Sequence, residues 1–214
     1  MDVFTQYGDL VVDALGTTLL ITALSSLGAL VIGILVTVAR VSPVPVLRGV
    51  AFCFVQFFLN VPLLALLLLA VFALPDAGLL MPLTTTVVVV LALYEGAYVA
   101  EAVRSGVNTV APGEVEAARA LGMRFAQVMR KVVVPQALRG VVQPLGNVGI
   151  ALLMNTALAA TVGVVELTSA ANRINNVAAQ PIVVYAGVGA VYMAMALCLG
   201  VLAGRVEKKV AVQR

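Results

Sequence analysis

The sequence contains no histidine, only two cysteines and few charged residues, and each shortage excludes a class of function. Histidine is the commonest general acid and base in enzymes, so no catalytic residue is predicted in these 214 residues. Cys53 and Cys198 both lie in apolar stretches, where cysteine usually behaves as a small hydrophobe. We therefore predict neither a disulfide framework nor a metal site. A G-x-x-x-x-G-K-[ST] run is also missing, so ATP is not expected to bind this chain.

The scarcity of charge reflects a membrane environment. Only 11% of the residues are charged and 62% are hydrophobic, which is far from the balance of a soluble domain. Backbone groups find no hydrogen-bond partners in lipid, and the apolar runs do not alternate as barrel strands do, so they must be helices. We predict an all-α integral membrane protein with a single transmembrane domain over 1–214, a core at about 15–204, and five transmembrane helices at 15–39, 50–74, 83–103, 141–167 and 182–203.

The positions of lysine and arginine predict the orientation. Of the 13 such residues, 12 lie between stretches one and two, between three and four, or after stretch five, and only Arg173 lies on the opposite side. Positive loops stay in the cytoplasm, so the amino terminus is expected outside and the carboxyl terminus inside. The net charge of +3 is scattered along loops, so membrane lipid rather than nucleic acid is the expected surroundings.

Proline and small residues predict local features within the spans. Pro62 lies inside the second stretch, and Pro144 with Gly146 is expected to interrupt the fourth, as in helices that line a cavity. Ala196, Gly200 and Gly204 form a stripe that would let another helix approach closely, although small residues are also simply common in membrane helices.

A polar segment at 108–139 separates the third and fourth stretches and is predicted to form two short cytoplasmic helices. Pro112 suits a first helical turn, and Gly122 can end the first helix by taking a positive φ. Pro135 is expected to end the unit. Val115, Ala118 and Leu121 share one helical face, which predicts an apolar ridge that fits a groove in a partner protein.

At this point the chain resembles a known family, the transmembrane subunits of binding-protein-dependent ABC importers. The family's loop reads E-A-A, three residues, G, nine residues, then I-x-L-P. The matching residues here, with valines for the Ile and Leu, are Glu116, Ala117, Ala118, Gly122, Val132, Val134 and Pro135. The resemblance implies the type I importer permease fold and a coupling helix that docks on a cytoplasmic ATPase, with Leu121 beside the motif residues as a further contact.

Within that family the chain is most similar to the polar amino acid branch, and to its glutamate permease subunits in particular. The stretches that carry this likeness include Arg40 to Pro43, Arg104 to Val110, and segments of spans two to four. From them we take the candidate residues of the substrate pathway: Asn60, Pro62, Glu95, Tyr98, Asn155 and Thr156. The branch often has cations where this chain has Leu59 and Met154, so contacts to a substrate carboxylate are expected from a partner subunit.

Glu95 lies near the middle of the third stretch, where an ionised side chain is costly and indicates a pathway, a pair or a cavity. One interpretation is structural, with Glu95 protonated or paired with a partner subunit. The other is functional, because an acid there would attract a substrate ammonium group and oppose a second carboxylate. At the inner end of the same stretch, Glu101 and Arg104 are spaced to form an ion pair. Asn155 and Thr156 can line the route or join helices.

The resemblance implies a set of partners. These are a cytoplasmic ATPase dimer that holds ATP and Mg, a second permease subunit that we expect to be a different chain, and an extracytoplasmic substrate-binding protein. The location implied is the bacterial plasma membrane. Two other functions stay open at this stage. An ion-gradient-driven transporter or channel could use Glu95 as a proton relay but needs no coupling helix. An intramembrane hydrolase would need a placed nucleophile and base.

Overall fold

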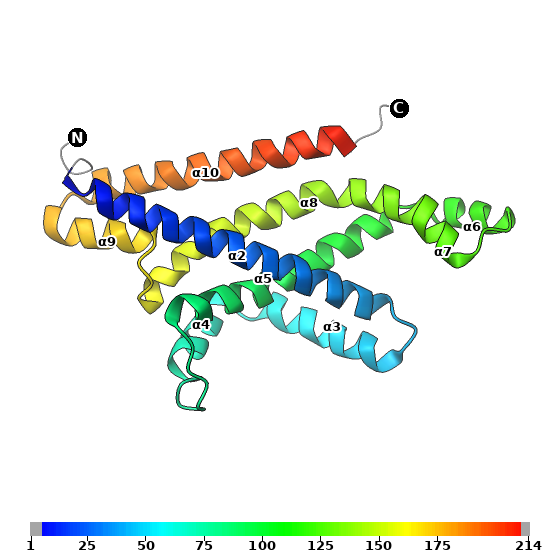
Figure 1. Ribbon diagram of the computed structural model, residues 1–214, viewed down its shortest axis with the longest axis horizontal. Helices are drawn as coiled ribbons and strands as arrows, with labels where there is room; N and C mark the ends of the chain where they lie inside the picture. The colour runs from blue at the N-terminus through cyan, green and yellow to red at the C-terminus, as the bar shows by residue number, and fades with distance from the viewer. Residues whose placement is uncertain (1–5, 211–214) are drawn as a thin grey trace.

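The computed structural model describes residues 6–210, and every regular element in that range is helical. Figure 1 shows an elongated molecule in which α6 and α7 project from the end opposite the start of α2. In chain order the elements are α2 (Gly8–Val41), α3 (Pro45–Asn60), α4 (Leu63–Phe72), α5 (Leu83–Asn108), α6 (Pro112–Ala120), α7 (Phe125–Val128), the π-helical turn η1 (Met129–Val133), α8 (Val134–Asn155), the 3-10 helix η2 (Thr156–Val162), α9 (Leu167–Ala178) and α10 (Pro181–Val210).

Four helices in this range are long and apolar enough to cross a membrane, namely Gly8–Val41, Leu83–Asn108, Arg139–Val162 and Pro181–Lys209. A fifth span is formed if α3 and α4, which are bent by 100° relative to each other, are counted as one. This arrangement confirms the predicted all-α membrane fold with five apolar stretches.

The bend between α3 and α4 is centred on Pro62, as the sequence predicts. Pro62 has no N–H to continue the helical ladder, and the preceding residue Val61 takes an extended conformation with ψ 131°. Beyond the bend, Leu63 and Leu67 pack into a core with Ile21 of α2. The proline therefore turns the second half of this span toward α2 and α5.

α2 packs along α5 through a seam that requires glycine. A Cβ atom added to Gly33 would lie 2.3 Å from Cγ1 of Val99, and one added to Gly96 would lie 2.8 Å from Cγ2 of Ile32. Both distances are well below van der Waals contact, so the two backbones approach this closely only because these positions carry no side chain. Figure 1 shows α2 crossing over α5 in this region.

The small-residue stripe predicted at Ala196, Gly200 and Gly204 does not make the close helix contact of α10. Among the described residues nothing lies within 4 Å of a Cβ added at Gly204, and the nearest atom to one at Gly200 is 3.8 Å away. α10 instead meets α8 closely where Gly146 faces Ala203, at 2.6 Å from an added Cβ. Within this chain, the close approach of α10 therefore involves Ala203 and Gly146 and not the predicted stripe.

The predicted early interruption of span four is wrong. Pro144 lies inside α8, which continues as an α-helix to Asn155. The interruption comes later, where the chain tightens into the 3-10 helix η2 and then stops at Gly163, whose φ is +98°. Pro144 removes only one backbone hydrogen bond, and the packing of the surrounding helix keeps the chain helical across it.

Pro135 likewise does not end the 108–139 unit. The backbone stays helical from α7 through η1 into α8, with Met129 and Val134 both in the right-handed helical region. The N–H of Val134 donates to the carbonyl of Met129, which is the wider spacing of a π-turn. We infer that this π-turn accommodates Pro135, which lacks an N–H, so that α7, η1 and α8 form one continuous helical stretch.

Candidate functional sites

The 108–139 segment forms a helical hairpin with a small core of its own. Gly122 ends α6 with a φ of +77°, as predicted. The core consists of Val110, Ala118, Val128 and Val133, with Val107, Val115, Met123, Met129 and Val132 packed around it. Glu114 of α6 accepts a hydrogen bond from Gln136 of α8, which joins the first helix to the start of the next span.

The predicted ridge on α6 does not face outward as a unit. Ala118 is only 5% exposed and Val115 is half-buried, because both pack into the core of the segment. Leu121, in contrast, is 83% exposed. The periodicity correctly grouped Val115 with Ala118, but the face they share is turned toward the chain itself, so a partner protein cannot contact Ala118 directly.

An exposed surface lies at the tip of the same segment, and we call its members Glu116, Ala117, Leu121 and Phe125 the tip surface. Phe125 is 70% exposed and was not identified from the sequence as a site residue. The sequence carried no signal for it, because single apolar residues are commonly exposed on protein surfaces. The tip surface includes two large apolar side chains, Leu121 and Phe125, and the carboxylate of Glu116.

Glu95 lies at a polar pocket between α5 and α8 with a volume of about 310 Å³. Its side chain is 1% exposed, and Oε1 accepts a hydrogen bond of 2.7 Å from Nδ2 of Asn155. Within residues 6–210 we find no donor to the second carboxylate oxygen. The pocket is lined by Tyr94, Glu95, Tyr98, Asn147, Val148, Ala151 and Asn155.

Three of the predicted pathway residues, Glu95, Tyr98 and Asn155, therefore meet at one pocket. Tyr94 and Asn147 complete it and were not predicted as site residues. Helical spacing from the predicted residues could have identified both. Asn147 lies two turns before Asn155 on α8, and Tyr94 lies one turn before Tyr98 on α5, with 3.2 Å between their hydroxyls.

The other predicted pathway residues lie apart from this pocket. Thr156 is fully buried and donates a hydrogen bond of 2.6 Å to the carbonyl of Leu153, so its hydroxyl is occupied within its own helix. Asn60 is exposed on α3 just before Pro62, and its amide donates to the carbonyl of Gln56 at 2.7 Å. Met154 lines a separate apolar groove that α10 also lines and is not among the lining residues of the Glu95 pocket.

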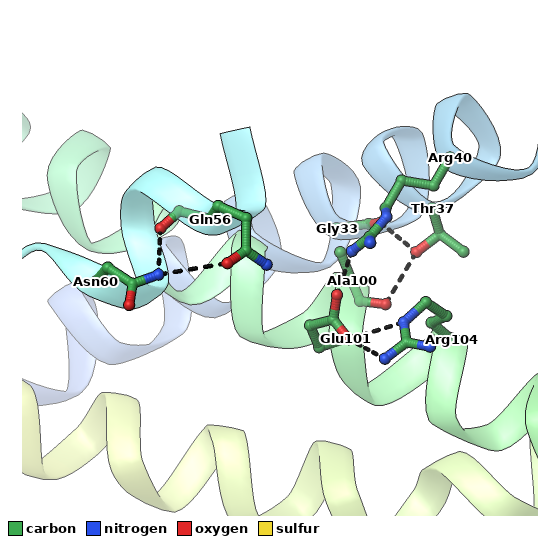
Figure 2. A network of polar contacts seen from close by, with 8 residues as sticks. All are labelled: Gly33, Thr37, Arg40, Gln56, Asn60, Ala100, Glu101 and Arg104. Carbon is green, nitrogen blue, oxygen red and sulfur yellow. Dashed lines mark hydrogen bonds and ion pairs between the residues drawn. The ribbon is translucent and has the colours of Figure 1, made fainter. Parts of the chain in front are cut away.

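Glu101 of α5 holds an arginine on each of its carboxylate oxygens (Figure 2). Nε and Nη2 of Arg104 lie 2.8 and 2.6 Å from Oε2, which confirms the predicted pair within α5. The other oxygen, Oε1, pairs with Nη1 of Arg40, which comes from α2. Local spacing could reveal only the first of these pairs, because Arg40 reaches Glu101 through the packing of two distant segments.

A second buried carboxylate, Glu166, was not identified from the sequence. It begins α9, where its oxygens accept hydrogen bonds from the backbone N–H groups of Thr168 and Ser169 at 2.9 and 2.8 Å. The hydroxyl of Tyr192, on α10, donates to the same carboxylate. The fourth apolar span ends at Val162, earlier than the predicted 167, so Glu166 lies outside it, and burial raises the pKa of its carboxyl. The residue thus fixes α9 against α10.

A helical chain with about five apolar spans, a polar pocket between two of them and an exposed hairpin at one end has the features of a membrane permease. The chain belongs to the family of binding-protein-dependent transport system inner membrane components, whose pattern matches residues 29–212. It is therefore a multi-pass component of an inner membrane transport system. Membership implies an ATPase and a substrate-binding protein as partners in general.

Individual relatives match over almost the whole chain. The glutamate transport system permease protein GluC of Corynebacterium efficiens is 34% identical, over 99% of this chain and 98% of that protein. The probable glutamine ABC transporter permease protein GlnM of Bacillus subtilis is 31% identical, over 97% and 94%. A crystal structure of an amino acid ABC transporter with histidines superposes with a TM-score of 0.91 at 32% identity, covering 96% of both chains.

Proposed function

We propose that this chain is one of two permease subunits through which an ATP-driven importer takes up a polar amino acid, glutamate or a relative such as glutamine or arginine. The relatives named above are amino acid permeases, which supports this substrate class. In the proposal ATP and Mg bind only to the partner ATPase, and the second permease subunit is a different chain. The lysine and arginine distribution supports an orientation in which 108–139 faces the cytoplasm.

The observation that carries the proposal is the pocket around Glu95. A carboxylate that is 1% exposed inside a span requires compensation, and Asn155 supplies only one hydrogen bond. The ammonium group of an amino acid would supply the missing positive charge. Tyr94 and Tyr98 also line the pocket, and the faces of aromatic rings attract cations.

The same pocket limits what this chain contributes to recognition. Its lining includes no lysine or arginine, so a substrate carboxylate would meet only neutral donors here, the amides of Asn147 and Asn155 and the hydroxyls of Tyr94 and Tyr98. Glu95 would repel a second carboxylate placed near it. In our proposal the ammonium end of the substrate therefore lies on this subunit, and cationic groups of the second permease subunit hold the carboxylates.

Uptake by the whole importer in proteoliposomes tests the proposal. We expect import to require ATP, and we expect Glu95→Gln to reduce uptake at least about tenfold, because it removes the charge that faces the ammonium group. Competition among glutamate, glutamine and arginine should also change in this variant. Glu207→Gln, on α10 outside the pocket, serves as the control. ATP-independent import would refute the importer, and unchanged selectivity in Glu95→Gln would refute the substrate contact.

The tip surface is the proposed contact with the ATPase. Glu116, Ala117 and Leu121 are exposed there, whereas Gly122 acts by ending α6 and Ala118 by holding the hairpin core. The apolar side chains would fill a groove on the ATPase, and the carboxylate of Glu116 would select its orientation. Import that persisted in Glu116→Lys with the ATPase still bound would argue against this contact.

A further inference from the structure

The ion-pair cluster of Arg40, Glu101 and Arg104 joins two spans near the end that carries 108–139. The side chains of Arg40 and Glu101 are only 17% and 24% exposed. An ion pair of this kind is directional, and because Arg104 also pairs with Glu101, removing Arg40 breaks the contact with α2 without leaving the carboxylate unpaired. Each carboxylate oxygen of Glu101 is used, one toward α2 and one toward its own helix.

The surrounding contacts add to this connection. The hydroxyl of Thr37 on α2 lies 3.3 Å from the carbonyl of Ala100 on α5, and 2.8 Å from that of Gly33, as Figure 2 shows. The guanidinium of Arg40 lies 5.5 Å from the ring centroid of Phe52, which brings α3 to the same cluster. Apolar contacts in the seam are non-directional and allow sliding, whereas these polar contacts fix the register of α2 against α5.

The cluster lies two helical turns before the end of α5, and α5 leads directly into the hairpin. Close packing also joins this end of α5 to the start of α8, since a Cβ added to Gly106 would lie 2.2 Å from Cγ1 of Val141. The hairpin is thus attached at both ends to a tightly packed pair of helices. The hairpin is therefore connected to both α5 and α8, and the contacts around Glu101 connect α5 to α2.

We propose that Glu101 is a positioning residue for energy coupling: through Arg40 it makes α2 and α5 move as one body, so that movement of the 108–139 hairpin reaches the spans. The inference rests on the proposed function, in which an ATPase acts on that hairpin. Arg104 has a different part, because it pairs with Glu101 within the same helix and its side chain is 45% exposed. Of the two arginine contacts of Glu101, that of Arg40 connects the two spans and that of Arg104 does not.

Two variants separate these contributions in the whole importer, reconstituted with its ATPase, second permease subunit and binding protein. The readout is the number of ATP molecules hydrolysed per amino acid imported, which loss of folded protein does not change. Arg40→Gln is expected to raise this ratio about fivefold or more, within the usual range of coupling between sites. Arg104→Gln is the matched control and should stay within about twofold of the wild type, because exposed pairs contribute little.

Arg40→Gln with a wild-type ratio would overturn the proposal. If that variant does not assemble, a disulfide between Thr37→Cys and Ala100→Cys, in a chain with Cys53 and Cys198 replaced by serine, gives an independent test. Helices that move as one body tolerate this link, so import should continue in the oxidised protein. Import that stops on oxidation and returns on reduction would show that α2 and α5 move apart. ATP-independent import by the wild type would instead refute the proposed function.

Discussion

The glycine seam between α2 and α5 leads to a quantitative prediction for Gly33→Ala. The added methyl group would lie 2.3 Å from Cγ1 of Val99 and 3.0 Å from the carbonyl oxygen of Gly96. Carbon atoms in contact are about 3.5–4.0 Å apart, so the helices would have to separate by more than about 1 Å. Overpacking of this kind costs about 1–3 kcal/mol.

Gly16→Ala on the same helix is the matched control. Nothing in the described chain lies within 4 Å of a Cβ at Gly16. Both substitutions gain the same helix propensity, about 1 kcal/mol, so the difference between the two variants isolates the overpacking cost. For a chain of this size the melting temperature falls by about 2–4 °C per kcal/mol. A cost of about 2 kcal/mol therefore lowers the melting temperature of Gly33→Ala roughly 4–8 °C below that of the control.

Thermal unfolding of the purified importer in detergent measures this difference, with both variants at the same protein concentration. The two variants should also differ in cross-linking between α2 and α5, because separation of the helices lengthens the contact between Thr37 and Ala100. Equal melting temperatures for Gly33→Ala and Gly16→Ala would refute the reasoning, since they would show that the seam accepts a side chain.

The remaining predictions concern the tip surface and Glu166. Leu121→Asp should weaken binding of the ATPase roughly 30-fold, as for a central interface residue. It should leave thermal stability unchanged because the side chain is 83% exposed. A pull-down with purified ATPase measures the loss of binding, and undiminished binding would contradict the proposed contact of the tip surface with the ATPase. Glu166→Gln should remove the part of the pH dependence of folding stability that comes from the Glu166 carboxyl. Because burial raises the folded-state pKa of Glu166, the folded chain binds this proton more tightly than the unfolded chain, and stability from this group falls as pH rises through the interval between the two pKa values. The melting temperature of the wild type relative to Glu166→Gln should therefore decrease as pH rises above the ordinary pKa of a glutamate carboxyl, and a constant or increasing difference would contradict this sign.

Features that depend on local backbone chemistry were predictable from the sequence. Gly122 ends α6 because glycine readily takes a positive φ, and Pro62 breaks α3 from α4 because it lacks an N–H and restricts the residue before it. The pair of Glu101 with Arg104 follows from helical spacing alone. The five apolar stretches follow from composition and the thickness of a membrane.

Features that depend on packing between distant segments were not predictable. Pro144 and Pro135 carry the same chemistry as Pro62, yet helix packing and a π-turn keep the chain helical through them. Periodicity identified the shared face of Val115 and Ala118 but not its direction, because a stripe of apolar residues can cover a partner or the chain itself.

The pocket around Glu95 was likewise predictable only in part. The sequence identified Glu95 as unusual because a carboxylate inside a span is costly wherever it points. Its hydrogen bond to Asn155 joins residues on different helices, and Tyr94 and Asn147 become pocket residues only through the crossing of α5 and α8. Thr156 has an equally polar side chain but turns its hydroxyl into its own helix.

The bend at Pro62 also bears on the lipid that surrounds the chain. At Val61 and Pro62 the backbone is extended, and Gln56 and Asn60 are exposed on the preceding turn of α3. Acyl chains offer no hydrogen bonds to such groups, so irregular backbone at membrane depth must contact protein or water. Bound lipid in an assembled importer should therefore be absent from the junction of α3 and α4.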